Sequence, residues 1–388
     1  MAAAFDASSA HAARRGPPPA PARPGDTLEQ VDTPALLLDL DVMEHNMRGV
    51  HARILDAGLR IRAHGKAHKC PPLALRQIEA GAQGICCQKV GEAEVFAAWG
   101  VQDILVTNQV VGQAKADRAA RLAGQVRLAV CVDDAAQIGP LVDAARRHGT
   151  ELGVLVEVDV GQNRCGVADV AAVLALARAV LSHAPALRFR GLQAYRGTVQ
   201  HMRTPQARRE AVAQTCAQVR ELVDALAAQD IACELVTGGG TGSYVHELGS
   251  GLYNEVQPGS YVLMDTDYGA NQPDPQAPEL GHALSAWCTV ISVQGERAVL
   301  DGGLKAFAVD SGLPRVLAPG WTVANLSDEH SVIVRQPGAQ AEPLAVGDRV
   351  RMLPGHCDPT VNLHDWIVAV RQGVVEEVWP VAARGALF

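Results

Sequence analysis

The chain contains 388 residues, of which 48% are hydrophobic and 20% charged, a composition typical of folded globular proteins rather than disordered ones. Its formal net charge of −8 leaves no broad basic field for nucleic acid, and no apolar run reaches the roughly 18–20 residues that span a bilayer. We therefore expect neither a nucleic-acid nor a membrane partner. Nine cysteines without a CxxC pair argue against a disulfide framework and favour a reducing, cytoplasmic setting.

The first thirty residues differ in composition from the rest of the chain. Residues 1–30 are dominated by Ala, Pro and Arg and offer little to bury, so we expect a disordered N-terminal arm. A transit peptide is the alternative interpretation, because Asp6 is the only acidic residue before Asp26.

From Pro34 onward, short apolar runs alternate with longer amphipathic stretches, which indicates repeated βα units. The expected strands are Arg60–Ala63, Gly84–Gln88, Ile104–Thr107, Val126–Val132, Val154–Asp159, Arg188–Ala194, Cys233–Thr237 and Glu255–Gln257. Helical patterns separate them, as in Pro72–Ala80, Val90–Gly100, Ala135–His148, Val170–Ser182 and Arg208–Gln229. Eight strands within about 200 residues favour an α/β fold of the (β/α)8 TIM-barrel type, over residues 31–273. The last unit is the weakest, since Gly249–Tyr253 has poor helical character.

The pattern changes after Asp274. Alternating runs such as Ala286–Val293, Ala298–Asp301, Ser331–Arg335 and Ile367–Arg371 are separated by turns and predict a C-terminal antiparallel β domain over residues 274–388. The boundary is expected in Asn271–Pro278. The run Ala35–Asp39, within residues 31–40, could add a strand to this second domain.

In a βα barrel, functional groups lie on the loops that follow the strands. Two glycine- and hydroxyl-containing turns follow the last two predicted strands, and they are Gly239-Gly240-Thr241-Gly242-Ser243 and Gly259-Ser260-Tyr261. Their backbone N–H groups and hydroxyls are suited to binding a phosphate. A tight turn that needs positive φ is the alternative, but the co-occurrence of two such turns favours phosphate binding.

Lys66 follows the first predicted strand and alternates with His64 and His68, so the three side chains are expected to share a side. Neighbouring cations and partial burial would lower its pKa, as an imine-forming amine requires. Taken alone, Lys66 is better interpreted as a solvated surface lysine. A phosphate site on the same rim changes this, because a phosphate site with an imine-forming lysine is what pyridoxal phosphate requires.

The second domain contains the segment Gly355-His356-Cys357-Asp358-Pro359. If it is extended, His356 and Asp358 point to one face and Cys357 to the other. An imidazole and a carboxylate suit a divalent ion such as Mn²⁺ or Mg²⁺. A packed histidine next to a turn-capping aspartate is the alternative.

Together these segments resemble the fold-type III pyridoxal-phosphate enzymes, which have the alanine-racemase barrel, and within them the family of D-threonine aldolase, 3-hydroxy-D-aspartate aldolase and D-serine dehydratase. The resemblance covers residues 31–385. It is carried by Asp32–Pro34, His64–Lys69, Gly84–Val90, Glu157–Gly166, Gly191–Tyr195, Gly238–Ser243, Gly259–Tyr261, Met264–Asp265 and His356–Leu363.

The resemblance implies a role for each matching residue. Lys66 would carry the pyridoxal 5′-phosphate, Arg164 and Gln193 would lie near its ring, and the two turns would hold its phosphate. His356 and Asp358 would hold the metal, and a homodimer is expected. The dehydratases differ at the third position of the metal motif, where a cysteine holds zinc. Because Asp358 is a hard carboxylate that suits Mn²⁺ or Mg²⁺, the aldolase branch is favoured.

The implied function is cleavage of D-3-hydroxy amino acids, such as D-threonine, D-phenylserine or 3-hydroxy-D-aspartate, to glycine and an aldehyde. His201, aided by Tyr195, would take the proton of the substrate hydroxyl. A loop histidine outside the site is the alternative for His201. Arg196 could favour an acidic substrate side chain or lie at the surface.

Three rival functions remain open. A dehydratase of the same family would release a 2-keto acid instead of glycine. A racemase would need no hydroxyl-binding ion, so EDTA would leave it active. A non-catalytic pyridoxal-phosphate-binding protein is disfavoured by the β domain, because such proteins are typically a barrel alone.

Overall fold

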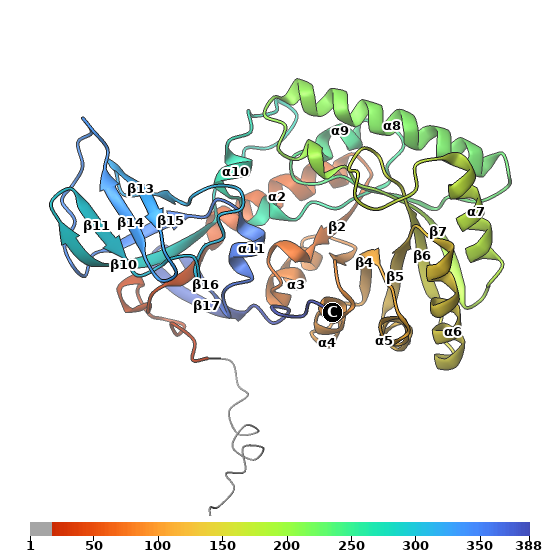
Figure 1. Cartoon of the computed structure of the whole chain (residues 1–388), viewed down its shortest axis with the longest axis horizontal. Helices are drawn as coiled ribbons and strands as arrows, with labels where there is room; N and C mark the ends of the chain where they lie inside the picture. The colour runs from red at the N-terminus through yellow and green to blue at the C-terminus, as the bar shows by residue number, and fades with distance from the viewer. Residues whose placement is uncertain (1–17) are drawn as a thin grey trace, which may run out of the picture.

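The molecule is a barrel with a second β domain beside it, as Figure 1 shows for this computed structural model, which describes residues 18–388. Eight parallel strands close into the barrel. They are β2 (Arg60–His64), β3 (Gly84–Cys87), β4 (Asp103–Gln109), β5 (Arg127–Val132), β6 (Leu152–Glu157), β7 (Leu187–Ala194), β8 (Leu235–Gly238) and β9 (Glu255–Val256). The predicted (β/α)8 barrel is confirmed, with strand ends shifted by no more than two residues.

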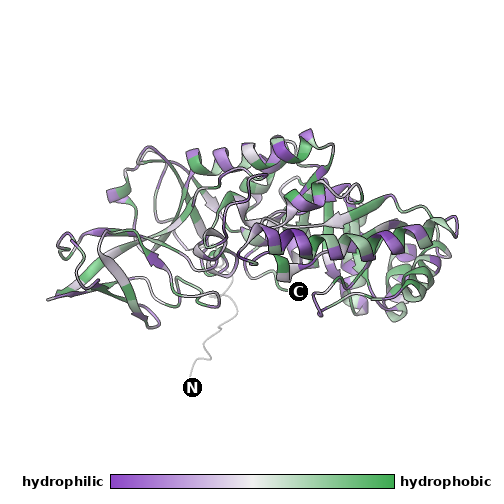
Figure 2. Ribbon diagram, turned by 90° about the horizontal axis from the view of Figure 1, so that it is seen from above, coloured by the Kyte–Doolittle hydropathy of each residue, from purple (hydrophilic) through white to green (hydrophobic). Residues whose placement is uncertain are grey.

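Helices surround the barrel, and most of them have one apolar face that packs on the strands. In chain order they are α2 (Leu40–Asp56), α3 (Pro71–Glu79), α4 (Val90–Ala98), α5 (Gln113–Ala123), α6 (Ile138–His148), α7 (Val170–Leu181) and α8 (Pro205–Ala227). Short helices α9 (Tyr244–Leu248) and α10 (Thr266–Gly269) follow. Figure 2 shows hydrophilic and hydrophobic residues alternating along the helices, as burial of one face requires. Asp39 and Asp169 begin α2 and α7 by accepting backbone N–H groups.

The second domain is a nine-stranded, mostly antiparallel sheet. Its strands are β1 (Ala35–Asp39), β10 (Leu284–Gln294), β11 (Arg297–Leu300), β12 (Arg315–Val316), β13 (Trp321–Leu326), β14 (Ser331–Arg335), β15 (Arg349–Leu353), β16 (Trp366–Arg371) and β17 (Val374–Pro380). Strand β1 pairs antiparallel with β10 and parallel with β16, so the N-terminal strand lies inside a sheet built from the C-terminal residues. This pairing ties the two ends of the sequence together.

The prediction that residues 1–30 form a disordered arm is wrong for residues 18–30. Residues 1–17 lie outside the described residues, but residues 18–30 contact the β domain. Gly25 N–H donates to Val375 O at 2.8 Å, and Trp287 Nε1 donates to Leu28 O at 3.1 Å. The open edge of β17 offers backbone partners that composition alone does not reveal. No helix within residues 18–388 is both long and apolar enough to cross a bilayer.

Candidate active site

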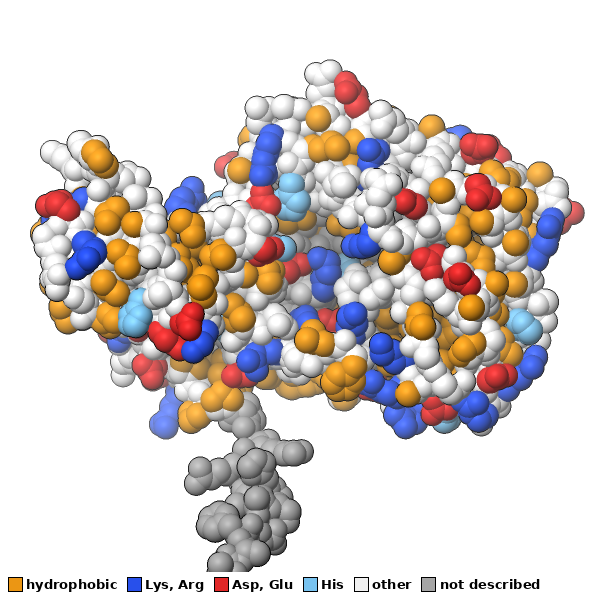
Figure 3. Space-filling model, viewed as in Figure 1, with side chains coloured by type: hydrophobic (Ala, Val, Ile, Leu, Met, Phe, Trp, Pro, Cys, Tyr) orange, Lys and Arg blue, Asp and Glu red, His pale blue; other side chains and the backbone are white. Residues whose placement is uncertain are grey.

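A cavity of about 310 Å³ opens at the C-terminal ends of the barrel strands. Figure 3 shows lysine or arginine, acidic and histidine side chains gathered around a hollow between the barrel and the β domain. Nine of the residues predicted from the sequence line the cavity: His64, Lys66, Arg164, Gln193, Tyr195, Gly240, Thr241, Gly259 and Ser260. Residues from five loops therefore meet at one place, as the barrel geometry predicts.

Lys66 lies in a short 3₁₀ turn directly after β2 and reaches the β domain. Its Nζ is 2.5 Å from Oδ2 of Asp358, so one ion pair bridges the two domains. Burial disfavours the ammonium, but the Asp358 carboxylate outweighs burial and raises the pKa of Lys66. The expectation that neighbouring cations lower the pKa of Lys66 is therefore wrong for this arrangement, because a carboxylate, rather than a second cation, is its nearest charged neighbour.

The segment around the predicted metal ligands is not extended. Residues Cys357–Val361 form the short helix α11, with His356 as its N-cap residue. Cys357 N–H donates to the buried Asp265 carboxylate at 2.8 Å, which fixes the start of α11 against the barrel rim. His356 Nδ1 lies 2.6 Å from Asp310, and Asp358 accepts a hydrogen bond from Ser260 Oγ at 3.2 Å. The condition under which His356 and Asp358 would share one face of an extended segment is therefore not met, because this buried carboxylate stabilises a helical turn.

His64 forms part of the cavity floor through a polar network. Its Nε2 lies 3.1 Å from both Gln88 Nε2 and Thr107 Oγ1. Burial and the nearby Lys66 hold the pKa of His64 well below its usual value, so the ring is neutral. His68 does not share this side, because the 3₁₀ turn rotates it into the core, where it contacts Gln77 at 3.1 Å.

The two glycine-containing turns present several uncommitted donors to the cavity. Among residues 18–388, the backbone N–H groups of Thr241, Gly259 and Ser260 have no hydrogen-bond acceptor. The hydroxyl of Thr241 accepts the N–H of Tyr261 at 3.1 Å, which leaves its own proton free to donate. An anion of phosphate size is the natural ligand for such a set of N–H and O–H groups.

Four residues predicted in these turns lie behind the cavity instead: Gly239, Gly242, Ser243 and Tyr261. The Gly242 N–H donates to Gln200 Oε1 at 2.9 Å, and the Ser243 hydroxyl donates to Glu247 at 3.0 Å. The Tyr261 hydroxyl is fully buried and lies 2.6 Å from His51 Nε2. Gly239, at φ +68°, backs against Glu247. These residues support the turns from the side away from the cavity. Sequence spacing does not show which residues of a turn face the cavity and which lie behind it.

His201 and Arg196 lie outside the cavity wall. The His201 ring packs at a tilt of 46° against Tyr268, which does line the cavity, with ring centroids 4.6 Å apart. Its Nδ1 is 3.1 Å from an Asp267 oxygen. The Arg196 guanidinium donates to Ala211 O on α8 at 3.0 Å, so it points away from the cavity. The hypothesis that Arg196 selects acidic substrates is therefore not supported by its position.

Five further lining residues are not among those that the sequence predicts: Gln88, Thr107, Glu157, Gln257 and Tyr268. The first four lie within the ranges of the predicted strands, at or near their C-terminal ends. Polar residues at strand ends therefore indicate the site as well as polar residues in the loops do. Burial raises the pKa of Glu157, whose carboxylate accepts from Gln109 Nε2 at 2.5 Å. Tyr268 comes from α10 and has no comparable sequence signal.

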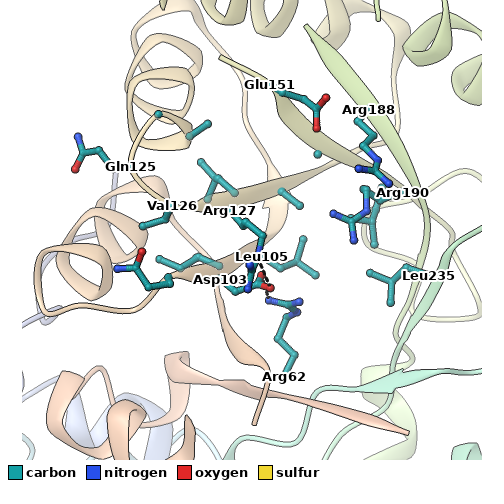
Figure 4. A pocket seen from close by; sticks show the side chains of 18 residues that line it. Arg62, Asp103, Leu105, Gln125, Val126, Arg127, Glu151, Arg188, Arg190 and Leu235 are labelled. Carbon is teal, nitrogen blue, oxygen red and sulfur yellow. Dashed lines mark hydrogen bonds and ion pairs between the residues drawn. The ribbon is translucent and has the colours of Figure 1, made fainter. Parts of the chain in front are cut away.

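A second, larger cavity of about 500 Å³ lies at the opposite end of the barrel. Figure 4 shows Arg62, Arg127, Arg188 and Arg190 around it, with Asp103 and Glu151. Arg62 lies between Asp103, at 2.6 Å, and Glu255, at 3.0 Å. Arg188 and Arg190 share Glu234. Most charges at this end are therefore paired with one another.

Family models of known proteins match the barrel and the β domain of this chain separately. Residues 38–267 match the family model described as alanine racemase, N-terminal domain, and residues 283–370 match a putative serine dehydratase domain. D-Threonine aldolase of Arthrobacter sp. is 48% identical over 95% of this chain and 96% of its own length. 3-Hydroxy-D-aspartate aldolase of Paracoccus denitrificans (strain Pd 1222) is 48% identical over 94% of this chain and 95% of its own length.

The structural comparison agrees with these relatives. The crystal structure of D-threonine aldolase from Filomicrobium marinum superposes with a TM-score of 0.92 at 42% identity, covering 95% of this chain and 100% of the other. D-threo-3-hydroxyaspartate dehydratase of Delftia sp. is more distant, at 29% identity over 86% of this chain and 93% of its own length. The chain therefore belongs to the alanine-racemase-like family of barrels, in the group that contains D-threonine aldolase and 3-hydroxy-D-aspartate aldolase.

Proposed function

We propose that the protein is a pyridoxal-phosphate- and divalent-metal-dependent aldolase that cleaves D-3-hydroxy amino acids to glycine and an aldehyde. The observation that carries the proposal is the meeting of Lys66, from the barrel, with Asp358, from the β domain, at the rim of one cavity. A cofactor-holding amine and a metal-binding carboxylate are needed within reach of the same substrate. The relatives, which are aldolases over nearly the full chain, support this choice.

The residues of the cavity fit pyridoxal phosphate. Lys66 would hold its aldehyde, and the free N–H groups of Thr241, Gly259 and Ser260 would hold its phosphate. Arg164, which lines the cavity and makes no ion pair within residues 18–388, would face the ring. When bound, the cofactor supplies an electron sink for the electron pair of the breaking Cα–Cβ bond.

His356 and Asp358 fit a hard divalent ion such as Mn²⁺ or Mg²⁺, because they supply an imidazole and a carboxylate. Within residues 18–388 no three His, Cys, Asp or Glu side chains form a metal-binding group, so water or substrate would provide the other ligands. Asp358 is shared between this role and the ion pair with Lys66. Loading Lys66 with the cofactor would therefore free the carboxylate that the ion needs.

His201, which contacts the cavity-lining Tyr268 from behind, is the proposed base for the proton of the substrate hydroxyl, received through an intervening water. Burial lowers its pKa, against the opposing influence of Asp267, so the ring is neutral at pH 7 and able to accept a proton. Asp267 lies beside Nδ1 and would orient the ring. Tyr195 stays protonated, because burial raises its pKa, and it can donate a hydrogen bond within the cavity.

Product analysis tests the proposal. The purified protein would be supplied with pyridoxal phosphate and incubated with D-threonine, D-phenylserine or 3-hydroxy-D-aspartate, with Mn²⁺ or with EDTA. Glycine and the matching aldehyde, formed with Mn²⁺ and lost in EDTA, are the expected products. A 2-keto acid would establish a dehydratase instead, and EDTA-resistant racemisation would establish a racemase.

We also propose a homodimer and a cytoplasmic setting. The homodimer follows from the arrangement expected for this family and can be measured by light scattering coupled to size-exclusion chromatography. The cytoplasmic setting is supported by the nine cysteines, all of which are free thiols in the described residues.

A further inference from the structure

A buried carboxyl group lies directly behind the predicted phosphate-binding turn. Glu247, on α9, is 5% exposed, and its Oε1 accepts a hydrogen bond from Ser243 Oγ at 3.0 Å. Its other oxygen, Oε2, is buried with no hydrogen-bond partner. No ion pair joins Glu247 to any residue among 18–388. A buried carboxylate with so few partners is costly to keep charged.

Glu247 is part of a network that holds the turn from its outer side. The Ser243 hydroxyl oxygen accepts from Gly240 N–H at 3.2 Å and from Gln200 Nε2 at 2.9 Å. Gln200 Oε1 in turn accepts from Gly242 N–H. The N–H groups of Gly240 and Gly242 therefore donate to groups behind the turn. The N–H of Thr241, which lies between them, remains free to donate to a ligand in the cavity.

The surroundings of Glu247 favour its neutral form. The titratable groups that face it are Tyr195, Tyr253 and Cys216, from the loop after β7, the loop before β9, and α8. All three are neutral at pH 7, since burial raises the pKa of each. Burial also raises the pKa of Glu247 to about 7, although the Ser243 hydrogen bond acts in the opposite direction. A phosphate on the other side of the turn would add a further negative charge.

We propose that Glu247 is a positioning residue of the phosphate-binding turn that acts as a neutral acid, so that binding of the cofactor phosphate and protonation of Glu247 favour each other. The inference rests on the proposed function, because it assigns the phosphate to this turn. The sign follows from linkage: a bound phosphate raises the proton affinity of Glu247, so cofactor affinity is highest below about pH 7 and falls as the pH rises above it.

The test is the dissociation constant of pyridoxal phosphate for the cofactor-depleted full-length chain, measured by absorbance from pH 6 to pH 9. Glu247→Gln keeps the shape and removes the titration. We expect the dissociation constant of the wild type to rise up to about tenfold per pH unit more steeply than that of Glu247→Gln above pH 7. Glu221→Gln, an exposed carboxylate on α8, is the matched control and should keep the wild-type slope.

Two further measurements separate this linkage from general weakening of the fold. Pyridoxal, which lacks the phosphate, should bind with the same pH dependence to the wild type and to Glu247→Gln. Ser243→Ala removes the hydrogen bond that lowers the pKa of Glu247, so it should move the fall in affinity to higher pH. It should also weaken binding at every pH, since the turn loses its brace.

Equal slopes for the wild type and a folded Glu247→Gln would overturn the inference, and so would a slope difference that persists with pyridoxal. If Glu247→Gln does not fold, an unchanged midpoint in Ser243→Ala would overturn it. Absence of pyridoxal-phosphate binding by the wild type would overturn the proposed function itself, which is a distinct result.

Discussion

The two ends of the barrel both carry polar cavities, but they differ in how their charged groups are used. At the N-terminal end, Arg62 is held between Asp103 and Glu255, and Arg188 shares Glu234 with Arg190. At the C-terminal end, Arg164 makes no ion pair within residues 18–388, and three backbone N–H groups have no hydrogen-bond acceptor there. Cavity size and polarity alone therefore do not identify a site. Donors that the protein leaves uncommitted are the better guide.

Among the substitutions that test this contrast between the two ends of the barrel, we expect replacement of Lys66 to have the largest effect on activity. Lys66→Ala should reduce aldolase activity at least about 10³-fold and abolish the visible absorbance of bound cofactor, because the amine that holds the aldehyde is gone. Arg127→Ala removes a cation at the opposite end and is the control that should keep both. Retention of the absorbance band in Lys66→Ala would refute the assignment of the lysine.

The N-terminal end should respond to mutation with a loss of stability. Arg62→Ala removes the counter-ion of the buried Glu255 and should lower the free energy of unfolding by about 3–5 kcal/mol, measured in urea. The double variant Arg62→Gln with Glu255→Gln removes the unpaired charge at Glu255 and leaves Asp103 paired with Arg127, so it should recover part of this loss. A large loss of activity per folded molecule, with stability unchanged, would mean that this end also serves catalysis.

His356 tests the link between the β domain and the chemistry. His356→Ala should lower activity by about 10²- to 10³-fold and abolish stimulation by Mn²⁺, while cofactor absorbance remains. His330→Ala, an exposed histidine of the same domain, is the matched control. Full metal-stimulated activity in His356→Ala would remove His356 from the metal site.

The smallest effect is expected at the rim of the N-terminal cavity. Arg188 and Glu234 are both about half exposed, so Arg188→Gln should change the free energy of unfolding by less than about 1 kcal/mol. The change should shrink further in about 0.5–1 M salt, because exposed ion pairs are screened. A larger, salt-independent change would indicate that Arg188 makes a stronger interaction than its exposure implies.

Local patterns are enough to predict the barrel, because strand and helix periods are properties of short segments. The same patterns predict which loops face the site, since the residues after parallel strands share one end of a barrel. This is why the sequence alone points to Lys66, Arg164, Tyr195 and Ser260, all of which line the cavity. Residue type then indicates the chemistry, because an amine and glycine-containing turns fit few cofactors.

Only the tertiary structure shows where each side chain points and which groups it contacts. Asp265, distant in sequence from Cys357, turns the metal motif into a helix, and α8 draws Arg196 away from the cavity. Which N–H groups of a glycine turn face a ligand depends on Gln200 and Glu247, which contact it only in the folded chain. The sequence by itself determined which groups were present and roughly where, because these follow from local periodicity and chain order. Only the fold decided which of them remain free, because hydrogen bonds and ion pairs form between residues that long-range packing brings together.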